Sequence, residues 1–279
     1  MIPEALLIRK SDGNLVPFDP EKLRASLERS DAAPHVVEWI LDDVDRLLVP
    51  GMSTRTIYRE AFNRLRQKSR HAAGRYRLKR ALLDLGPSGY PLEHFVGKLM
   101  EHQGFSTEVG GVHAGRCVSH EVDVWAKGSQ TLRIMECKFH SDVKRKSSIQ
   151  TALYVQARYQ DLVSNLSSDE AALTPVATVV TNTRFTSEAV EYGRCMGMEL
   201  ISWDQPRTGN LKQWIDESGF HPLTCLSSLS QQEKRTLLES GTVLCSELTA
   251  TLLERAGVPA KKHEKVLSEC TSIVEERTH

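Results

Sequence analysis

The stretch CVSHEVDVWAKGSQTLRIMECKF, residues 117–139, decides the fold of the middle of the chain. Its two halves, 117–126 and 131–139, are rich in strand-forming residues, and Lys-Gly-Ser-Gln between them supplies a turn. Another strand-like run, 106–112, precedes them and follows a helical pattern of apolar residues over 91–103. The stretch therefore predicts a helix followed by a three-stranded meander.

The residues after the meander continue the alternation of strands and helices. We expect a helix at 148–163, a strand at 175–180, a helix at 186–196 and a last strand at 199–203. The predicted order is α-β-β-β-α-β-α-β. This order favours the α/β (α+β) class, with a mixed sheet in the middle of the chain.

The two predicted strands in the quoted stretch carry four charged residues that could bind a metal ion or take part in catalysis. Period-two geometry places Glu121 and Asp123 on one face of their strand, and Glu136 and Lys138 on one face of the next. A hairpin would bring three carboxylates and one ammonium together, and clustered carboxylates repel one another unless a cation binds. Carboxylate oxygens with open water positions suit Mg²⁺, or Mn²⁺, and a nearby lysine can orient an attacking water.

Residues 91–203 resemble the PD-(D/E)xK nuclease core, and in particular the Mrr-like type IV restriction endonucleases and related junction resolvases. By this resemblance Asp123 is the motif aspartate and Glu136 and Lys138 are the E-x-K pair. Glu93 matches the glutamate that the family carries on its first helix. The resemblance implies a restriction-endonuclease-like αβββαβ core and Mg²⁺-dependent hydrolysis of phosphodiester bonds in DNA, with Asp123 and Glu136 as metal ligands.

Some residues of the same strands fit ordinary structural roles. Val122 stands where the motif's name has proline, at a position that tolerates change in the family. Glu121 fits a solvated carboxylate as well as it fits a ligand, and His120 points to the opposite face and is expected to be structural. A surface hairpin held by ion pairs is the competing interpretation of the whole cluster.

Four cations close to this core are candidates for binding nucleic acid. Lys144, Arg145 and Lys146 follow the E-x-K strand and could grip a phosphate strand, although a solvated basic loop fits equally. Arg158, on the next predicted helix, could contact the carboxylates or a scissile phosphate. A packing pair between Arg158 and Asp161 or Tyr154 is the favoured alternative, because these residues lie at helical spacing.

The beginning of the chain reads as a hairpin followed by helices. Residues 5–9 and 15–18 are strand-like, and Ser-Asp-Gly-Asn between them supplies a turn. Asp19 is a plausible N-cap, with proline at the first helical position, and a second helix is expected at 35–48. An ordered set of residues here resembles the opening of an ATP-cone, the nucleotide-sensing domain of ribonucleotide reductases and their transcriptional repressor. The set consists of Ile8-Arg9-Lys10, Asp12-Gly13, Phe18-Asp19 and Lys22-Leu23.

The ATP-cone resemblance covers roughly the first 85 residues and implies a site for ATP or dATP. By it, Arg9, Lys10 and Lys22 meet the phosphates and Thr54, which opens a helix, lies near the nucleotide. The family has its basic residues directly before Asp-Gly, whereas this chain inserts Ser11. A solvated basic hairpin is the alternative.

Two turn-rich breaks set the predicted domain boundaries. The break at 85–89 separates an ATP-cone-like domain at 1–88 from a nuclease-like domain at 89–208. The break at 204–210 separates the latter from a helical C-terminal region at 209–279, parts of which resemble helix-hairpin-helix elements. Because this region carries eight basic and ten acidic residues, a packing or dimerisation role is at least as well supported as nucleic-acid binding.

Composition excludes several classes of protein. Thirty-six Lys and Arg balance thirty-six Asp and Glu, although ten Lys or Arg and one acid fall between Ser53 and Arg80. No run of 18 apolar residues is present, and the first residues lack the order of a signal peptide, so we expect a cytoplasmic protein without membrane contact. The six cysteines form no C-x-x-C pair, which argues against zinc.

The leading hypothesis is a nucleotide-regulated, Mg²⁺-dependent endonuclease acting on DNA. No Walker A sequence is present, so ATP or dATP would be sensed and not hydrolysed. The alternative is a nucleotide-responsive nucleic-acid-binding regulator without cleavage activity, and a third option is a structural oligomerisation protein. Expected partners are DNA, a nucleotide effector and further copies of the chain, joined through the ATP-cone or the C-terminal helices.

Overall fold

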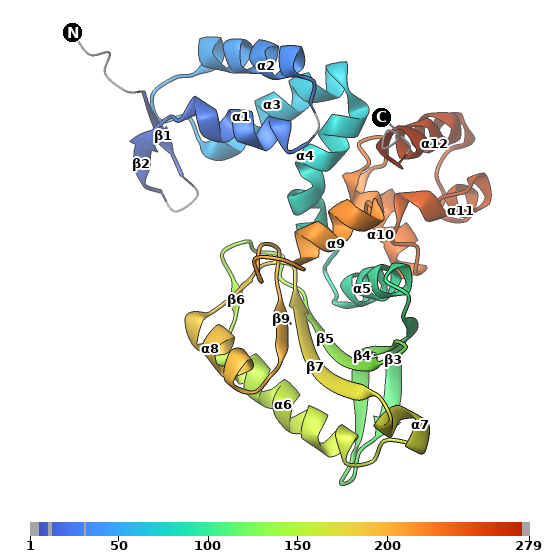
Figure 1. Ribbon diagram of the computed structural model, residues 1–279. Coiled ribbons are helices and arrows are strands. Elements are labelled where there is room, and N and C mark those ends of the chain that lie inside the picture. Colours follow the sequence, from blue (N-terminus) through green and yellow to red (C-terminus); the bar gives the residue numbers. More distant parts are fainter. Residues whose placement is uncertain (1–5, 11–12, 31, 275–279) are drawn as a thin grey trace. The chain divides into compact units, whose positions relative to one another are not determined.

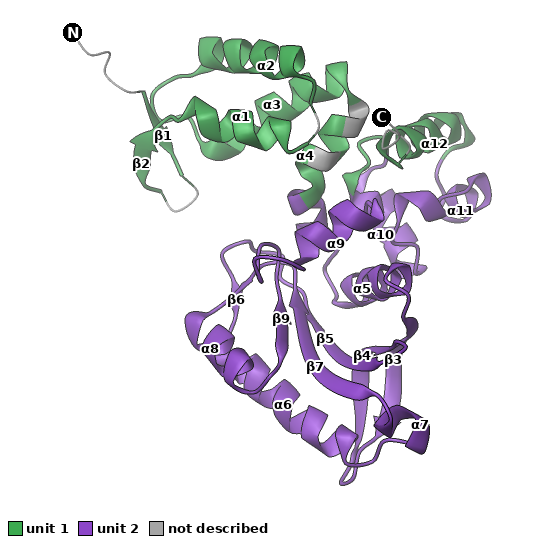
Figure 2. Cartoon of the chain, viewed as in Figure 1, with its two compact units in different colours: residues 1–78, 225–228, 259–279 green, residues 79–224, 229–258 purple. Residues whose placement is uncertain are grey.

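The computed structural model describes residues 6–10, 13–30 and 32–274. Figure 1 shows the course of the chain, and Figure 2 its division into two compact units. Unit 1 comprises Met1–Leu78, Cys225–Ser228 and Pro259–His279, and unit 2 comprises Lys79–Thr224 and Leu229–Val258. The boundaries expected after residues 88 and 208 separate domains that would fold independently. The two compact units do not test independent folding, so these boundaries stay predictions.

Unit 1 begins with a two-stranded hairpin, β1 (Leu7–Arg9) and β2 (Leu15–Pro17), paired antiparallel. The predicted cap of the first helix is confirmed, because the Asp19 side chain accepts a hydrogen bond from the Glu21 amide at 3.1 Å and Pro20 occupies the first helical position. The helices of this unit are α1 (Pro20–Glu28), α2 (Pro34–Leu47), α3 (Thr54–Lys68), α4 (Arg70–Leu83), which continues into unit 2, and α12 (Ala260–Val274).

The apolar faces of these helices form the core of unit 1. Leu27 of α1, Ile40 of α2, and Ala61 and Leu65 of α3 are fully buried. With the other buried residues of these helices, Leu23 of α1, Val36, Val37 and Val44 of α2 and Ile57 of α3, they recur at helical spacing, which explains which side each helix buries. Further along the chain, Glu269 of α12 is buried and accepts three hydrogen bonds from the Ser227 and Ser228 segment, at 2.7 to 2.9 Å.

Unit 2 contains a five-stranded mixed sheet in the order β3-β4-β5-β7-β9. The first three strands pair antiparallel and the last three parallel, so the expected α+β class and mixed sheet are confirmed. Its main elements are α5 (Tyr90–His102), β3 (Ser106–Ala114), β4 (Ser119–Lys127), β5 (Thr131–Lys138), α6 (Ile149–Val163), β7 (Thr174–Thr181), α8 (Ser187–Cys195) and β9 (Glu199–Ile201).

The predicted order of elements in the middle of the chain is confirmed, with additions. A short helix α7 (Ser168–Ala171) precedes β7, and two short strands, β6 (Lys146–Ser147) and β8 (Arg184–Phe185), pair parallel outside the main sheet. The C-terminal part of unit 2 is helical, as expected. It contains α9 (Leu211–Ser218), α10 (Gln231–Glu239) and α11 (Ala250–Arg255), with short 3₁₀ turns between them.

One predicted strand begins later than expected. The sequence favours a strand from residue 117, but β4 starts at Ser119. The amides of Cys117 and Val118 donate to the Asp161 carboxylate at 2.8 and 3.2 Å, so they are used by a side chain of α6 and not by a neighbouring strand.

Helices cover the sheet of unit 2. α5 packs against β3, β4 and β5, whereas α6 packs against β7 and α8 (Figure 1). The central strand β5 is buried along most of its length, including Leu132, Ile134 and Met135. Charged residues on β5 therefore lie in a partly desolvated place, and this is where the candidate site is found. Within the described part of the chain, no helix has the length and apolar character needed to cross a membrane.

Candidate active site

The candidate catalytic residues lie where β4 and β5 run side by side. The ladder between these strands ends at Val124 and Met135, one residue before Asp123 and Glu136. The Asp123 Oδ2 atom accepts a hydrogen bond from the Cys137 backbone amide at 2.7 Å. The Asp123 carboxylate is thereby tied to the backbone between Glu136 and Lys138, the two charged residues of the E-x-K pair.

A local irregularity in β3 faces this aspartate. The pairing of β3 with β4 joins Val109 to Val124 and Gly111 to Val122, but skips the residues between them. The skipped residue of β3 is Gly110, whose φ of 69° is available to glycine and strained for other residues. Val122 and Trp125, three residues apart, belong to the same apolar cluster. The strict alternation of side chains along β4 is therefore interrupted between Val122 and Trp125, whereas Glu121 and Asp123 both raise the pKa of Glu93, as expected for residues on a common face.

Glu136 is nearly buried and holds two cations. Its side chain is 8% exposed, and its Oε1 atom accepts a hydrogen bond from the Lys138 ammonium at 2.9 Å. The other oxygen accepts from the Arg158 guanidinium of α6. Lys138 is 44% exposed, so its ammonium remains able to meet solvent or a substrate.

Arg158 contacts the carboxylate site and not Asp161. Its guanidinium also donates to the Glu121 carbonyl oxygen at 2.9 Å and lies over the Tyr154 ring, 5.2 Å from its centroid. The favoured packing pair of Arg158 with Asp161 is wrong, whereas the pair with Tyr154 is present. Because the Arg158 side chain is 10% exposed, its structural role is to hold Glu136, and a contact with nucleic acid stays a prediction.

Glu93 completes the cluster from the first turn of α5. Burial raises the pKa of Glu93 to about 7, and the nearby carboxylates, Asp123 first, add to the rise. Burial likewise raises the pKa of Asp123 to about 6, with help from Glu136 and against the Cys137 amide and the cations Arg158 and Lys138. The four predicted catalytic residues thus share one electrostatic environment that carries more negative charge than it balances.

Such a cluster fits a hard divalent cation that brings its own water ligands. Mg²⁺ is usually held by one or two carboxylates together with water and substrate oxygens. Among the residues that the structure describes, no three His, Cys, Asp or Glu side chains are grouped closely enough to hold a metal on their own. Asp123 and Glu136 therefore remain the predicted metal ligands, in the two-carboxylate form.

His120 has the structural role expected for it. Its Nε2 atom lies 2.8 Å from Asp161 Oδ2, and the hydrogen bond to His120 is the first cause that lowers the pKa of Asp161 to about 2. Asp161, which also binds the amides of Cys117 and Val118, is thus a structural residue whose part the sequence did not reveal. Helical spacing placed it beside Arg158, whereas its partners lie more than 40 residues earlier.

The basic loop expected to bind nucleic acid is exposed. Lys144, Arg145 and Lys146 lie beyond the end of β5, and the Asp142 side chain accepts from the Lys144 amide at 3.0 Å. Lys146 belongs to β6 and lines a groove together with Arg184, which is paired with Asp204 at 2.6 Å. Their exposure leaves these residues available to a polyanion, and their role stays a prediction.

Unit 1 holds a cavity of about 230 Å³ at its hairpin. Three of the four residues predicted to bind nucleotide, Lys10, Lys22 and Thr54, line it, together with aromatic residues that include Tyr58 and Tyr76. The rings of Tyr58 and Tyr76 stack with centroids 4.8 Å apart, an arrangement that their separation in sequence did not indicate.

Arg9 and Lys22, two residues of the predicted nucleotide site, have other contacts or lie away from the cavity. Arg9 does not line the cavity, and its backbone amide donates to the Met52 carbonyl at 2.9 Å. Lys22 is paired with Asp19 at 3.1 Å and is largely exposed. Ser11 and Asp12 lie outside the described residues. The structure thus brings Lys10, Lys22 and Thr54 to one cavity and leaves Arg9 beside it.

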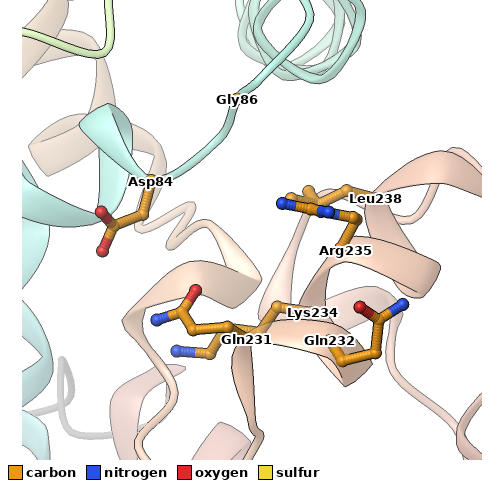
Figure 3. Close-up of a pocket in the computed structure, with 7 residues that line it drawn as sticks. All are labelled: Asp84, Gly86, Gln231, Gln232, Lys234, Arg235 and Leu238. Atoms are coloured by element: carbon orange, nitrogen blue, oxygen red, sulfur yellow. The ribbon is translucent and has the colours of Figure 1, made fainter.

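A second polar cavity lies in unit 2, between the link at residues 84–86 and the first turns of α10 (Figure 3). Its volume is about 120 Å³, against about 230 Å³ for the cavity at the hairpin of unit 1. Two of its three charged residues have structural partners: Asp84 pairs with Arg80 at 3.1 Å, and the Lys234 ammonium donates to the Thr224 carbonyl at 3.0 Å. We assign no ligand to this cavity.

Comparison with known proteins supports the fold. Residues 221–274 match a family model described as AF1548-like, C-terminal. The chain is 27% identical over 182 residues to an uncharacterised protein of Archaeoglobus fulgidus, covering 64% of this chain and 99% of that protein. It is similar to the crystal structure of the protein of unknown function AF1548, with a TM-score of 0.56 and 28% identity over 67% of this chain and 98% of that one. These descriptions name no activity, so the function is argued from the site.

Proposed function

We propose that this chain is an endonuclease that uses Mg²⁺ or Mn²⁺ to hydrolyse phosphodiester bonds in DNA. The observation that carries the proposal is the placement of Asp123 beside Glu136 and Lys138 on adjacent strands, with Glu93 sharing their electrostatic environment. A carboxylate pair can hold a divalent cation and a neighbouring lysine can orient a water, which are roles that metal-dependent phosphodiester hydrolysis can use.

Each residue has a role in this proposal. Asp123 and Glu136 hold the cation, which when bound polarises the scissile phosphate as a Lewis acid. The Asp123 carboxylate is oriented by the Cys137 amide, and Glu136 is oriented by Arg158. Lys138 orients the attacking water, whose oxygen forms a bond to phosphorus while a phosphorus–oxygen ester bond breaks. Glu93 adds negative charge and can accept the proton that the water loses.

The nucleotide part of the proposal rests on unit 1. Lys10, Lys22 and Thr54 line one cavity, and its aromatic walls offer surface for a base. Cationic side chains form charge-assisted hydrogen bonds with phosphates, and Thr54 opens a helix whose first amides favour anions. We propose that ATP or dATP binds here as an effector and favours one conformer or oligomer of the chain, because equal affinity for both states would change nothing.

The second candidate is a nucleotide-responsive nucleic-acid-binding regulator that does not cleave. It is favoured by the state of Glu136, both of whose oxygens already have cationic partners. In this alternative the Glu136 cluster is a structural ion-pair network. The two candidates differ in a single respect, which is metal-dependent cleavage.

A substrate panel tests the proposal. Plain, methylated, branched and single-stranded DNA, with RNA of the same sequence, would be incubated with the full chain and Mg²⁺ or Mn²⁺, with and without ATP or dATP. We expect cleavage of at least one DNA substrate that EDTA abolishes and that the nucleotide changes. Binding of DNA without cleavage of any substrate under any of these conditions would favour the regulator.

A further inference from the structure

We propose that unit 1 carries a second nucleic-acid surface, an arginine stripe that binds the phosphates of duplex DNA. The arginine stripe consists of Arg55, Arg59 and Arg66 on α3, with Arg77 of α4 beside them. The choice of DNA as the occupant rests on the proposed function. The charge and geometry of the stripe are independent of it.

Helical geometry places these arginines on one side of α3. At about 100° per residue, Arg55, Arg59 and Arg66 fall within an arc of about 60° that also contains Phe62. Of the buried residues of the helix, Ile57 and Ala61 fall on the opposite side, and Leu65 lies about 90° round the helix from the centre of the stripe. Arg55, Arg59 and Arg66 are exposed, so the stripe faces solvent while the other side of α3 faces the core.

The negative charge close to the stripe is mostly used elsewhere. The one acid of α3 is Glu60, and it binds Arg64 at 2.9 Å, a residue that also pairs with Asp43 of α2. Arg59 approaches Glu60 at 3.5 Å through its Nε atom, and its side chain is still 66% exposed. Arg55, Arg59 and Arg66 therefore present guanidinium groups to solvent on the exposed side of α3.

An aromatic ring holds two of the guanidinium groups in place. The guanidinium carbons of Arg66 and Arg77 each lie 5.8 Å from the centroid of Phe62. Cation–π contacts limit the rotamers of these long side chains, so less conformational entropy is lost when they bind phosphate.

The same contacts indicate which nucleic acid fits. Phe62 is partly buried against the core and already contacts two arginines, so it offers no open ring for an unpaired base. From Arg55 to Arg66 the helix rises about 16 Å, comparable with the axial rise of about five base pairs of a duplex. A row of cations without a stacking platform therefore favours the backbone of a double helix.

Salt-dependent binding of duplex DNA tests this proposal. A labelled 20-base-pair duplex would be titrated, in EDTA, with the full chain carrying Asp123→Asn, and its anisotropy followed between 50 and 200 mM NaCl. Each phosphate contact contributes about −0.9 to the slope of log K against log salt concentration. Removing two contacts with Arg59→Gln and Arg66→Gln should lower the slope by about 1.8 and weaken binding at least tenfold at 50 mM.

Two matched variants make the result specific. Arg29→Gln with Arg46→Gln removes two exposed cations of unit 1, one just after the end of α1 and one on α2, and should leave the slope unchanged. Arg59→Lys with Arg66→Lys keeps the charge and should retain most of the slope. Circular dichroism would confirm that each variant is folded, as expected for exposed positions.

The outcomes separate this proposal from the nuclease proposal. The stripe is overturned if the Gln variant binds like the Arg29 and Arg46 control, if the chain binds no duplex DNA, or if duplex RNA or polyglutamate competes better than duplex DNA. A chain that never cleaves DNA but shows the expected loss of slope would overturn the nuclease and keep the stripe. If the Arg59→Gln and Arg66→Gln variant binds duplex DNA like its control and the wild type cleaves DNA, the stripe is overturned and the nuclease proposal is kept.

Discussion

Replacing Asp123 by asparagine should make the metal-free protein more stable at alkaline pH. Burial and Glu136 raise the pKa of Asp123 from 3.8 to about 6. A raised pKa means that the folded state favours the neutral carboxyl, a contribution that is fully present below the unfolded pKa and lost as pH rises through the folded pKa. At pH 8 the ionised Asp123 is therefore a cost to folding, which Asn removes while keeping an oxygen acceptor for the Cys137 amide.

The magnitude follows from the size of the pKa shift. About two pH units at 1.36 kcal/mol each give a ceiling of about 3 kcal/mol, and relaxation and water around the site reduce it, so we expect a gain of about 1 to 2 kcal/mol at pH 8. Near pH 4 the folded carboxyl is protonated and the unfolded one is only about half ionised, so the gain should shrink to a few tenths of a kcal/mol there.

Urea denaturation at pH 8 and pH 4, in EDTA, measures this difference. Glu108→Gln is the matched control, because it removes one carboxylate from the neighbouring strand at a side chain that is 61% exposed, and it should change stability by less than about 0.5 kcal/mol. Adding Mg²⁺ should stabilise the wild type and leave the Asp123→Asn variant unchanged. A variant that is less stable than wild type at pH 8, or equally shifted at both pH values, would refute the argument that Asp123 is an uncompensated buried charge.

Three further outcomes are expected. Lys138→Ala should slow cleavage by about 100-fold under single-turnover conditions with little change in Mg²⁺ affinity measured by calorimetry, and a normal rate would remove its proposed role. Lys10→Ala with Lys22→Ala should weaken ATP or dATP binding by about 100-fold, since each charge-assisted contact contributes about 1.5 to 3 kcal/mol; unchanged affinity would place the nucleotide elsewhere. A fragment of residues 79–258 should melt at a higher temperature than one of residues 88–258, because the segment between them contains fully buried leucines, and equal melting temperatures would contradict this.

The sequence predicted the elements that depend on local patterns. Apolar spacing and turn residues located α5, the three strands of the meander and the elements α6, β7, α8 and β9 that follow them. Asp19-Pro20 located the start of α1. The juxtaposition of Asp123 and Glu136 also followed from a short turn between two strands, because a tight hairpin leaves few possible registers.

What the sequence could not predict depends on contacts between distant residues. Arg158 and Asp161 are neighbours by helical spacing, but they have different partners. Arg158 donates to Glu136, whereas Asp161 accepts from the amide of Cys117. β6 and β8 have two residues each, too few to give a periodic signal, and pair with each other across the intervening helix α6. The grouping of α12 with the helices that precede Lys79 likewise depends on packing that no local pattern encodes.

The most direct test of the central claim is the single-turnover cleavage rate of one duplex DNA substrate with Mg²⁺, compared among wild type, Asp123→Asn and Glu108→Gln. The account predicts metal-dependent cleavage by the wild type and by Glu108→Gln, and a rate at least about 1,000-fold lower for Asp123→Asn with duplex binding retained. Equal rates for wild type and Asp123→Asn, or no metal-dependent cleavage by the wild type, would contradict it.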